Sequence, residues 1–183
     1  WNNNIGAGGA KGLQLLALSS LRSVNLGQNN IGVEGIKGIQ LPAMLQYLSL
    51  GSNNISTEGA KGLQLLVLSS LRFLDLSGNN IGDEGAKGLQ LRVLSSLASL
   101  DLSWNNIGAE GIKGIQLPSM LRDLTLWGNN IGDEGANELK KLVPMLQTLH
   151  LGYNNISAER TKGLQFPPML QSLVLYGNNM GDE

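Results

Sequence analysis

The chain has 183 residues, of which 25 are Gly, 5 are Pro and none is Cys, and its formal net charge is −1. This net charge does not favour binding to nucleic acid or to an anionic membrane, and without cysteine neither a disulfide framework nor a thiolate metal site can form. Because 42% of the residues are hydrophobic, 15% are charged and no apolar run reaches about 18 residues, we expect an ordered chain without membrane insertion.

A repeat organises the chain from its first residues. The pair Asn-Asn followed by Ile or Met occurs eight times at intervals of 24 to 26 residues, with its first member at Asn3, Asn29, Asn53, Asn79, Asn105, Asn129, Asn154 and Asn178. Such a period is typical of solenoids, in which each unit packs on its neighbours, so we expect residues 1–183 to form a single domain. We also expect this domain to be a fragment of a larger protein, because Trp1 already lies within a repeat.

Each unit is expected to begin with a short strand. The segment from Leu71 to Ile81 has the pattern LxxLxLxxNxI, and the last seven Asn pairs all follow such a segment. Its alternation directs Leu74 and Leu76 to one face and Phe73 to the other, which predicts seven parallel strands in one sheet. The first asparagine of each of the eight pairs is expected to bond the open backbone of neighbouring turns, so that the amides form a ladder along the stack.

A short helix is expected after each strand. The segment 82–90 has the sequence GDEGAKGLQ, and Gly or Ser at its first position with a nearby Glu is typical of a helix N-cap. Internal glycines cost about 1 kcal/mol each, so packing must hold these helices. Residues 137–144 lack one of the glycines and predict the best helix. Solvated ion pairs are expected for Glu34 with Lys37, Glu58 with Lys61, Glu84 with Lys87, Glu110 with Lys113 and Glu159 with Lys162.

The combination LxxLxLxxNNIGDEGAKGL resembles the ribonuclease-inhibitor subtype of the leucine-rich repeat along the whole chain. The resemblance implies an α/β fold, a right-handed solenoid with a curved parallel sheet and short helices on its convex side. Relatives in this subtype include ribonuclease inhibitor, sensor regions of innate immune receptors, Ran GTPase-activating proteins and bacterial effectors, and because these bind unrelated partners the resemblance indicates the fold and not the function. The present units are shorter than is usual in that subtype, so we expect shorter helices and shallower curvature.

The variable positions of the repeat predict a binding face. Residues common to all units serve the stacking, whereas the outward strand positions and the position after them differ between units and collect Trp, Tyr, Ser, Gly, Asn and Asp. This composition is typical of recognition surfaces, although rim aromatics that merely shield the asparagine ladder are the alternative. The predicted partner-binding residues are Tyr47, Phe73, Asp75, Asp101, Trp104, Trp127, His150, Tyr153 and Tyr176.

Four of these aromatic residues are expected to form one continuous ridge along the sheet edge. They fall in four consecutive units and alternate between two neighbouring positions, with Gly or Ser in the other position each time. Contiguous exposed aromatic rings are typical of an interaction site. The predicted ridge consists of Trp104, Trp127, Tyr153 and Tyr176.

Two acidic residues, Asp75 and Asp101, occupy the same position on adjacent predicted strands. Their carboxylates are therefore expected about 5 Å apart, where like charges repel. Arg72 and Arg122 are expected to relieve part of this repulsion, as is a basic group of the partner. The pair is interpreted as an acidic spot that faces the partner.

Residues for catalysis or cofactor binding are not indicated by the sequence. His150 is the only histidine and has no nucleophile beside it, which indicates a residue of a binding face. The glycine-rich segments lack the spacing of a phosphate-binding loop and recur in nearly every unit. The glycosylation sequons at Asn54 and Asn155 arise from the exchange of Gly for Ser at the cap position. We predict no enzyme activity, no cofactor and no metal.

Recognition of a protein partner through the concave face and its aromatic rim, within a larger receptor, sensor or effector, is the function that the sequence favours. One alternative is a structural module that assembles end to end through its open ends. Another is an accessory that resembles a GTPase activator, which would need a protruding loop with a committed Asn or Arg.

Overall fold

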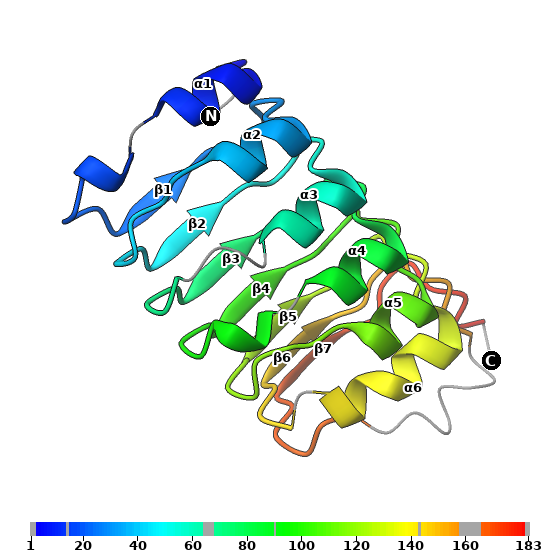
Figure 1. The fold of residues 1–183 in the computed structure, drawn as a ribbon. Helices are drawn as coiled ribbons and strands as arrows, with labels where there is room; N and C mark the ends of the chain where they lie inside the picture. The colour runs from blue at the N-terminus through cyan, green and yellow to red at the C-terminus, as the bar shows by residue number, and fades with distance from the viewer. Residues whose placement is uncertain are drawn as a thin grey trace.

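The computed structural model describes residues 3–13, 15–63, 68–89, 91–142, 144–157 and 166–181. Seven parallel strands form one sheet in chain order, as predicted (Figure 1). Each strand pairs in register with the next, so that Leu48 lies opposite Leu74, and Leu74 lies opposite Leu100. The strands are β1 (Ser23–Asn25), β2 (Tyr47–Ser49), β3 (Phe73–Asp75), β4 (Ser99–Asp101), β5 (Asp123–Thr125), β6 (Thr148–His150) and β7 (Ser172–Val174).

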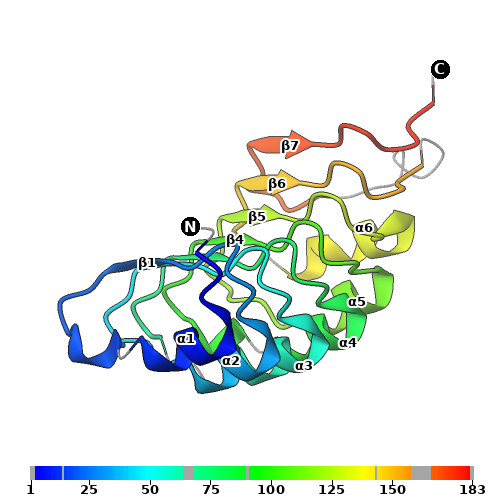
Figure 2. The same ribbon diagram turned by 90° about the horizontal axis from the view of Figure 1, so that it is seen from above.

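The helices all lie on the same face of the sheet (Figure 2). They are α1 (Gly6–Gly12), α2 (Gly32–Gly38), α3 (Ser56–Gly62), α4 (Gly82–Gly88), α5 (Ala109–Gly114) and α6 (Gly132–Leu142), with 3₁₀ turns η1 (Leu15–Ala17) and η3 (Leu91–Val93). The first five have six or seven residues and α6 has 11, so the sequence variant at Asn137 forms the longest helix, as predicted. No described element covers the opposite face of the sheet, which we call the open face.

The core between sheet and helices is built from the repeated leucines and isoleucines. Leu74, Leu76 and Ile81 of one unit are buried, as are their counterparts in the neighbouring units. Gly85 of α4 packs so closely on the preceding helix that a Cβ atom there would lie 3.1 Å from the Cα atom of Thr57. The glycines therefore lower helix propensity but let successive helices approach each other.

The asparagine ladder is present. The Nδ2 atom of buried Asn105 donates to the carbonyl oxygens of Leu76 at 2.9 Å and Leu102 at 3.1 Å, and its Oδ1 atom accepts from the backbone N–H groups of Asn79 at 3.0 Å and Ile81 at 3.3 Å. Equivalent bonds are made by Asn29, Asn53, Asn79, Asn129, Asn154 and Asn178. The ladder thus joins each unit to the one before it.

Asn3 does not share the role that we predicted for all eight asparagines. Its side chain is exposed, and its described contact is made by its backbone N–H group, which donates to Oδ1 of Asn29 at 2.8 Å. The amide of each other ladder asparagine donates to a carbonyl group of the preceding unit or of its own strand.

The predicted N-caps are wrong. The N-cap residues of helices α1 to α5 make no capping hydrogen bond with their own side chains. Instead the residue after the Asn-Asn-Ile motif adopts a positive φ, which is 61° at Ser56 and 65° at Gly82. Glycine recurs at this position because it adopts the left-handed conformation without a steric penalty.

Two units depart from this backbone path. Gly108 has a φ of −102°, and its N–H group donates to Oδ1 of Asp83 in the preceding unit at 2.6 Å. In the same way Ser157 donates to Asp133 through its N–H group at 2.7 Å and its hydroxyl at 2.8 Å. Both residues form a parallel bridge to the following unit. An aspartate one repeat earlier therefore sets the local conformation.

The convex face is covered by ion pairs between Lys and Glu. The predicted pairs of Glu58 with Lys61, Glu84 with Lys87 and Glu110 with Lys113 are confirmed, at 2.8 to 3.0 Å. The predicted pair of Glu34 with Lys37 is wrong, because Glu34 contacts Lys11 of α1 at 3.7 Å instead. The pair of Glu159 with Lys162 lies outside the described residues. The helix surface thus neutralises much of its own charge.

Candidate functional site

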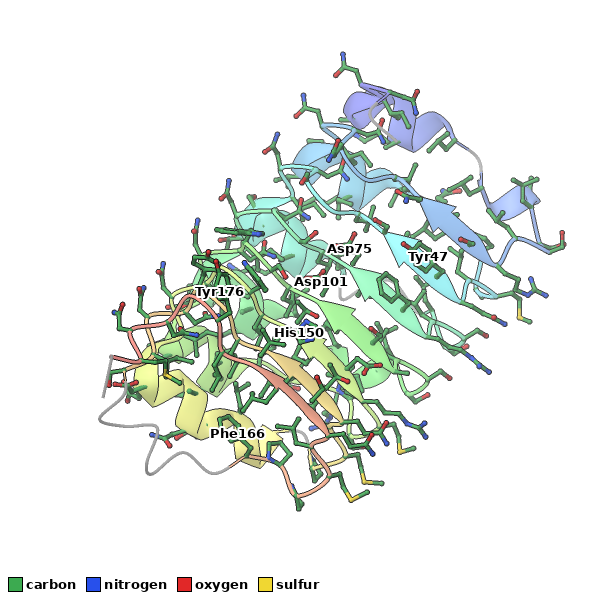
Figure 3. The ribbon with its side chains drawn as sticks, turned by 180° about the vertical axis from the view of Figure 1, so that it is seen from behind. Tyr47, Asp75, Asp101, His150, Phe166 and Tyr176 are labelled. Atoms are coloured by element: carbon green, nitrogen blue, oxygen red, sulfur yellow. The ribbon has the colours of Figure 1, made fainter. Side chains whose placement is uncertain are left out.

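The open face presents the first and third side chains of each strand and the residues that follow them (Figure 3). Its ionisable groups among the described residues of the strands are the carboxylates of Asp75, Asp101 and Asp123, the imidazole of His150 and the phenol of Tyr47. His150 lies between Thr125 and Val174 of the neighbouring strands, as predicted. Phe166, which the repeat places outside this face, packs against the core.

Trp104, Trp127, Tyr153 and Tyr176 contact one another and form the predicted continuous ridge, which we call the aromatic ridge. The ring centroids of Trp127 and Tyr153 are 5.4 Å apart, and those of Tyr153 and Tyr176 are 5.3 Å apart with the rings edge to face. Trp104 lies 6.5 Å from Tyr153, and Trp127 lies 6.0 Å from Tyr176. The ridge therefore crosses four consecutive units where the strands end.

Glycines of the next unit make room for these rings. A Cβ atom at Gly128 would lie 2.5 Å from the ring of Trp104, and one at Gly177 would lie 2.7 Å from the ring of Tyr153. The rings of Trp104 and Tyr153 can thus lie along the stack only because a glycine follows each of them at the same position of the next unit.

Two ridge residues have a strained backbone. The φ angle is 55° at Trp104 and 53° at Tyr153, whereas Gly78 and Gly128 occupy the same repeat position at 63° and 66°. The left-handed conformation costs about 1 kcal/mol for a residue with a side chain. The Trp104 side chain is nevertheless 58% exposed, and those of Tyr153 and Tyr176 are 42% and 66% exposed. Gln28 and Ser52 hold the same position at 58° and 54°, so the left-handed φ belongs to the repeat, and Trp104 and Tyr153 differ by the large exposed rings that they place there.

Tyr47 and Phe73 form a separate aromatic platform. They lie opposite each other on β2 and β3, with ring centroids 4.5 Å apart and planes only 1° from parallel. Among the described residues, no ring contact connects this pair to the aromatic ridge. The structure therefore divides the predicted aromatic residues into two groups on one face.

Asp75 and Asp101 lie opposite each other on adjacent strands, as predicted. The Asp75 carboxylate accepts hydrogen bonds from the hydroxyls of Ser49 and Ser77, both at 2.7 Å. The Asp101 carboxylate accepts from the hydroxyl of Ser103 at 2.6 Å and from its N–H group at 2.8 Å. These serines were missed in the sequence, where the recurring Asp-Leu-Ser triplet was the available signal.

The predicted relief of this carboxylate pair by arginine is wrong. Within the described residues, neither Arg72 nor Arg122 forms an ion pair. Burial raises the pKa of the Asp101 carboxyl above its ordinary value, and the charge of Asp75 raises it further, although the bonds from Ser103 and the charge of His150 oppose this. Ionisation of the Asp101 carboxyl therefore costs more free energy in the folded protein than in the unfolded chain.

Asp101→Asn is expected to raise the free energy of unfolding at pH 7. The Asp101 carboxyl has a higher pKa in the folded protein than in the unfolded chain, where it is about 3.9. The folded protein therefore still binds a proton at pH values at which the unfolded chain has released it. The free energy of unfolding thus falls as pH rises above about 4. Asparagine does not ionise, so the variant lacks this fall in the free energy of unfolding. It also keeps the local turn, because Asn25 at the same repeat position accepts a hydrogen bond from the N–H group of Gly27 at 3.0 Å. Urea unfolding at pH 4 and pH 7 measures both effects. Lower stability of the variant at pH 7 would contradict the assignment.

Groups of three or more His, Asp or Glu side chains placed to hold a metal ion do not occur in the described ranges. Likewise, none of the helices described above has the length and apolar character needed to cross a bilayer.

Comparison with known families gives one result that spans most of the chain. A family model described as "Leucine Rich repeat" matches six consecutive segments, residues 17–39, 42–63, 67–89, 93–115, 118–140 and 144–159. Each segment begins before a strand, and the first five run through that strand to the helix that follows it, so the matches follow the structural repeat. A search of curated proteins gives no significant match.

Proposed function

Because the chain belongs to the leucine-rich repeat family, we propose that it is a recognition module that binds a protein partner through its open face and aromatic ridge. Leucine-rich repeats generally mediate protein–protein interaction, and the family is typically without enzymatic activity. The resemblance of the repeat to receptor, sensor and effector domains supports a place for this module within such a larger protein.

The observation that carries this proposal is the aromatic ridge. Trp104 and Tyr153 stand at a repeat position of left-handed φ where other units have Gly, Gln28 or Ser52, and their large rings are exposed. A bulky exposed ring at such a position does not stabilise a fold, so its placement there supports a role in binding. Large rigid aromatic side chains are also the residues that dominate binding energy at protein interfaces.

The other predicted residues of the open face complete the proposed interface. The platform of Tyr47 and Phe73 offers a second apolar contact, nearer the start of the strands. Asp75, Asp101 and His150 offer polar contacts between the two aromatic groups. Such small polar and ionisable side chains supply hydrogen bonds and specificity around aromatic anchors.

Site-specific photo-crosslinking tests where the partner binds. A benzophenone amino acid is placed at Tyr176 of the ridge in one variant, and at Lys87 of the convex face in a control, and both are exposed to ultraviolet light in cells of the source organism. We expect a crosslinked protein from position 176 that is absent from position 87. Crosslinks of the same partner from position 87 alone would refute the proposed face, and crosslinks to the chain itself would support end-to-end assembly instead.

A further inference from the structure

A second surface lies at the edge of the sheet where the strands begin, which we call the turn edge. A turn precedes each strand, and in the last three units this turn carries Met120, Met145 and Met169. Each of them stands three residues before its strand, and β5, β6 and β7 pair in register. The three side chains therefore follow one another at strand spacing, about 4.8 Å apart. Each is about half exposed, and we call them the methionine row.

Arginines flank the methionine row. Arg122 follows Met120 by two residues, and Arg92 lines a shallow cavity of 430 Å³ together with Leu117, Pro118 and Met120. Both arginines are exposed. In the described ranges all ion pairs join Lys to Glu, and none involves an arginine. Figure 3 shows side chains that end in sulfur or nitrogen along this edge.

We propose that the turn edge binds an amphipathic, acidic helix of a protein partner, with its apolar side on the methionine row and its carboxylates on Arg92 and Arg122. Methionine is flexible and polarisable, so it adapts to apolar side chains of different shape. Arginine pairs with carboxylates through two parallel hydrogen bonds. Three methionines in a row span about 10 Å, which is the width of one helix.

An anionic membrane fits the same edge less well. Recognition of anionic lipids generally uses clusters of about four to eight basic residues, whereas among the side chains that the structure describes Arg92 and Arg122 flank the methionine row. Interfacial binding also favours Trp, Phe and Leu on the apolar side, and the aromatic ridge lies at the other edge, where the strands end. The turn edge is thus a surface separate from the proposed interface of the open face.

The test uses a synthetic helical peptide of about five turns with Leu on one side and Glu on the flanks, and its binding to the full chain is measured by fluorescence anisotropy. We expect binding that the same peptide with Lys in place of Glu does not show. Met120→Ser with Met145→Ser is expected to weaken it at least tenfold, and so is Arg122→Gln with Arg92→Gln. The repeat itself supplies the replacements at the methionines and at Arg122, since Ser70 and Ser96 occupy the methionine position, and Gln147 occupies that of Arg122.

Met44→Ser is the matched control, because Met44 stands in the same turn before β2, three units from Met120. It should leave peptide affinity unchanged, and the urea midpoints of all variants should match that of the parent chain. Equal binding of the Lys peptide, unchanged affinity of the Met120 and Met145 variant, or binding to phosphatidylserine vesicles without binding to the acidic peptide would overturn the proposal. Trp104→Gly with Trp127→Ser should leave peptide binding intact, which separates this surface from the aromatic ridge.

Discussion

Replacing Trp104 by Gly and Trp127 by Ser is expected to weaken partner binding roughly a thousandfold, while the free energy of unfolding changes by less than about 1 kcal/mol. Aromatic anchors at interfaces typically contribute about 2 kcal/mol each when they are truncated, and two of them account for the expected loss. The measurement is the dissociation constant of the crosslinked partner, once purified, beside urea unfolding of the same variant.

Stability should change little because the repeat already contains the replacement residues. Gly78 and Gly128 adopt the positive φ of Trp104 without strain, and Ser103 stands at the repeat position of Trp127. Relief of about 1 kcal/mol of strain is offset by loss of ring contacts of similar size.

Gln28→Gly is the control for this variant. Gln28 occupies the repeat position of Trp104, is exposed and has a φ of 58°, but it lies in the first strand's unit, away from the aromatic ridge. Its replacement should leave binding unchanged. If the ridge variant instead loses several kcal/mol of stability while each folded molecule still binds the partner, the rings shield the asparagine ladder and do not bind.

Asn105→Ala is expected to lower the free energy of unfolding by about 3 to 5 kcal/mol. The change leaves the backbone N–H groups of Asn79 and Ile81 without their acceptor, and it removes the donor to the carbonyl groups of Leu76 and Leu102. A buried polar group without a partner costs about 1 to 3 kcal/mol. Urea unfolding followed by circular dichroism measures the loss.

Asn106→Gly tests whether this loss belongs to the ladder. Asn106 is the next residue, is exposed, has a φ of 57° that glycine accepts, and donates to the exposed Asn80 side chain at 3.2 Å. We expect a change within about 0.5 kcal/mol. Equal losses from both replacements would mean that the side-chain amide of Asn105 does not hold the units together.

The repeat pattern alone was sufficient to predict the strands, the short helices, the asparagine ladder and the contiguity of the aromatic ridge. The physical reason is the in-register stacking of a solenoid, which places equivalent positions of successive units side by side. Trp127 and Tyr153 are 26 positions apart in the numbering, yet their ring centroids are 5.4 Å apart. Adjacency in the repeat therefore became adjacency in space.

The surroundings of the candidate site residues were less predictable. The sequence placed Asp75 and Asp101 on one face but suggested arginine as their partner, whereas serines bond both carboxylates. A strand directs Asp75 and Ser77 to the same side, so the Ser77 hydroxyl lies within hydrogen-bond distance of the Asp75 carboxylate. The arginines stand at the start of the strands, farther from that carboxylate. Glu34 likewise forms its ion pair with Lys11 of the previous helix and not with Lys37 of its own helix.

The backbone at Gly82 and Gly108 shows what only the tertiary structure decided. Both residues follow Asn-Asn-Ile, yet φ is 65° at Gly82 and −102° at Gly108. The difference follows from the preceding unit, where Thr57 stands before Gly82 and Asp83 stands before Gly108. The Asp83 carboxylate accepts the N–H group of Gly108, whereas the N–H group of Gly82 donates to the carbonyl oxygen of Asn105. The local sequence determined which conformations glycine could adopt, and a hydrogen bond across the stack selected one of them, because a buried N–H group must find an acceptor.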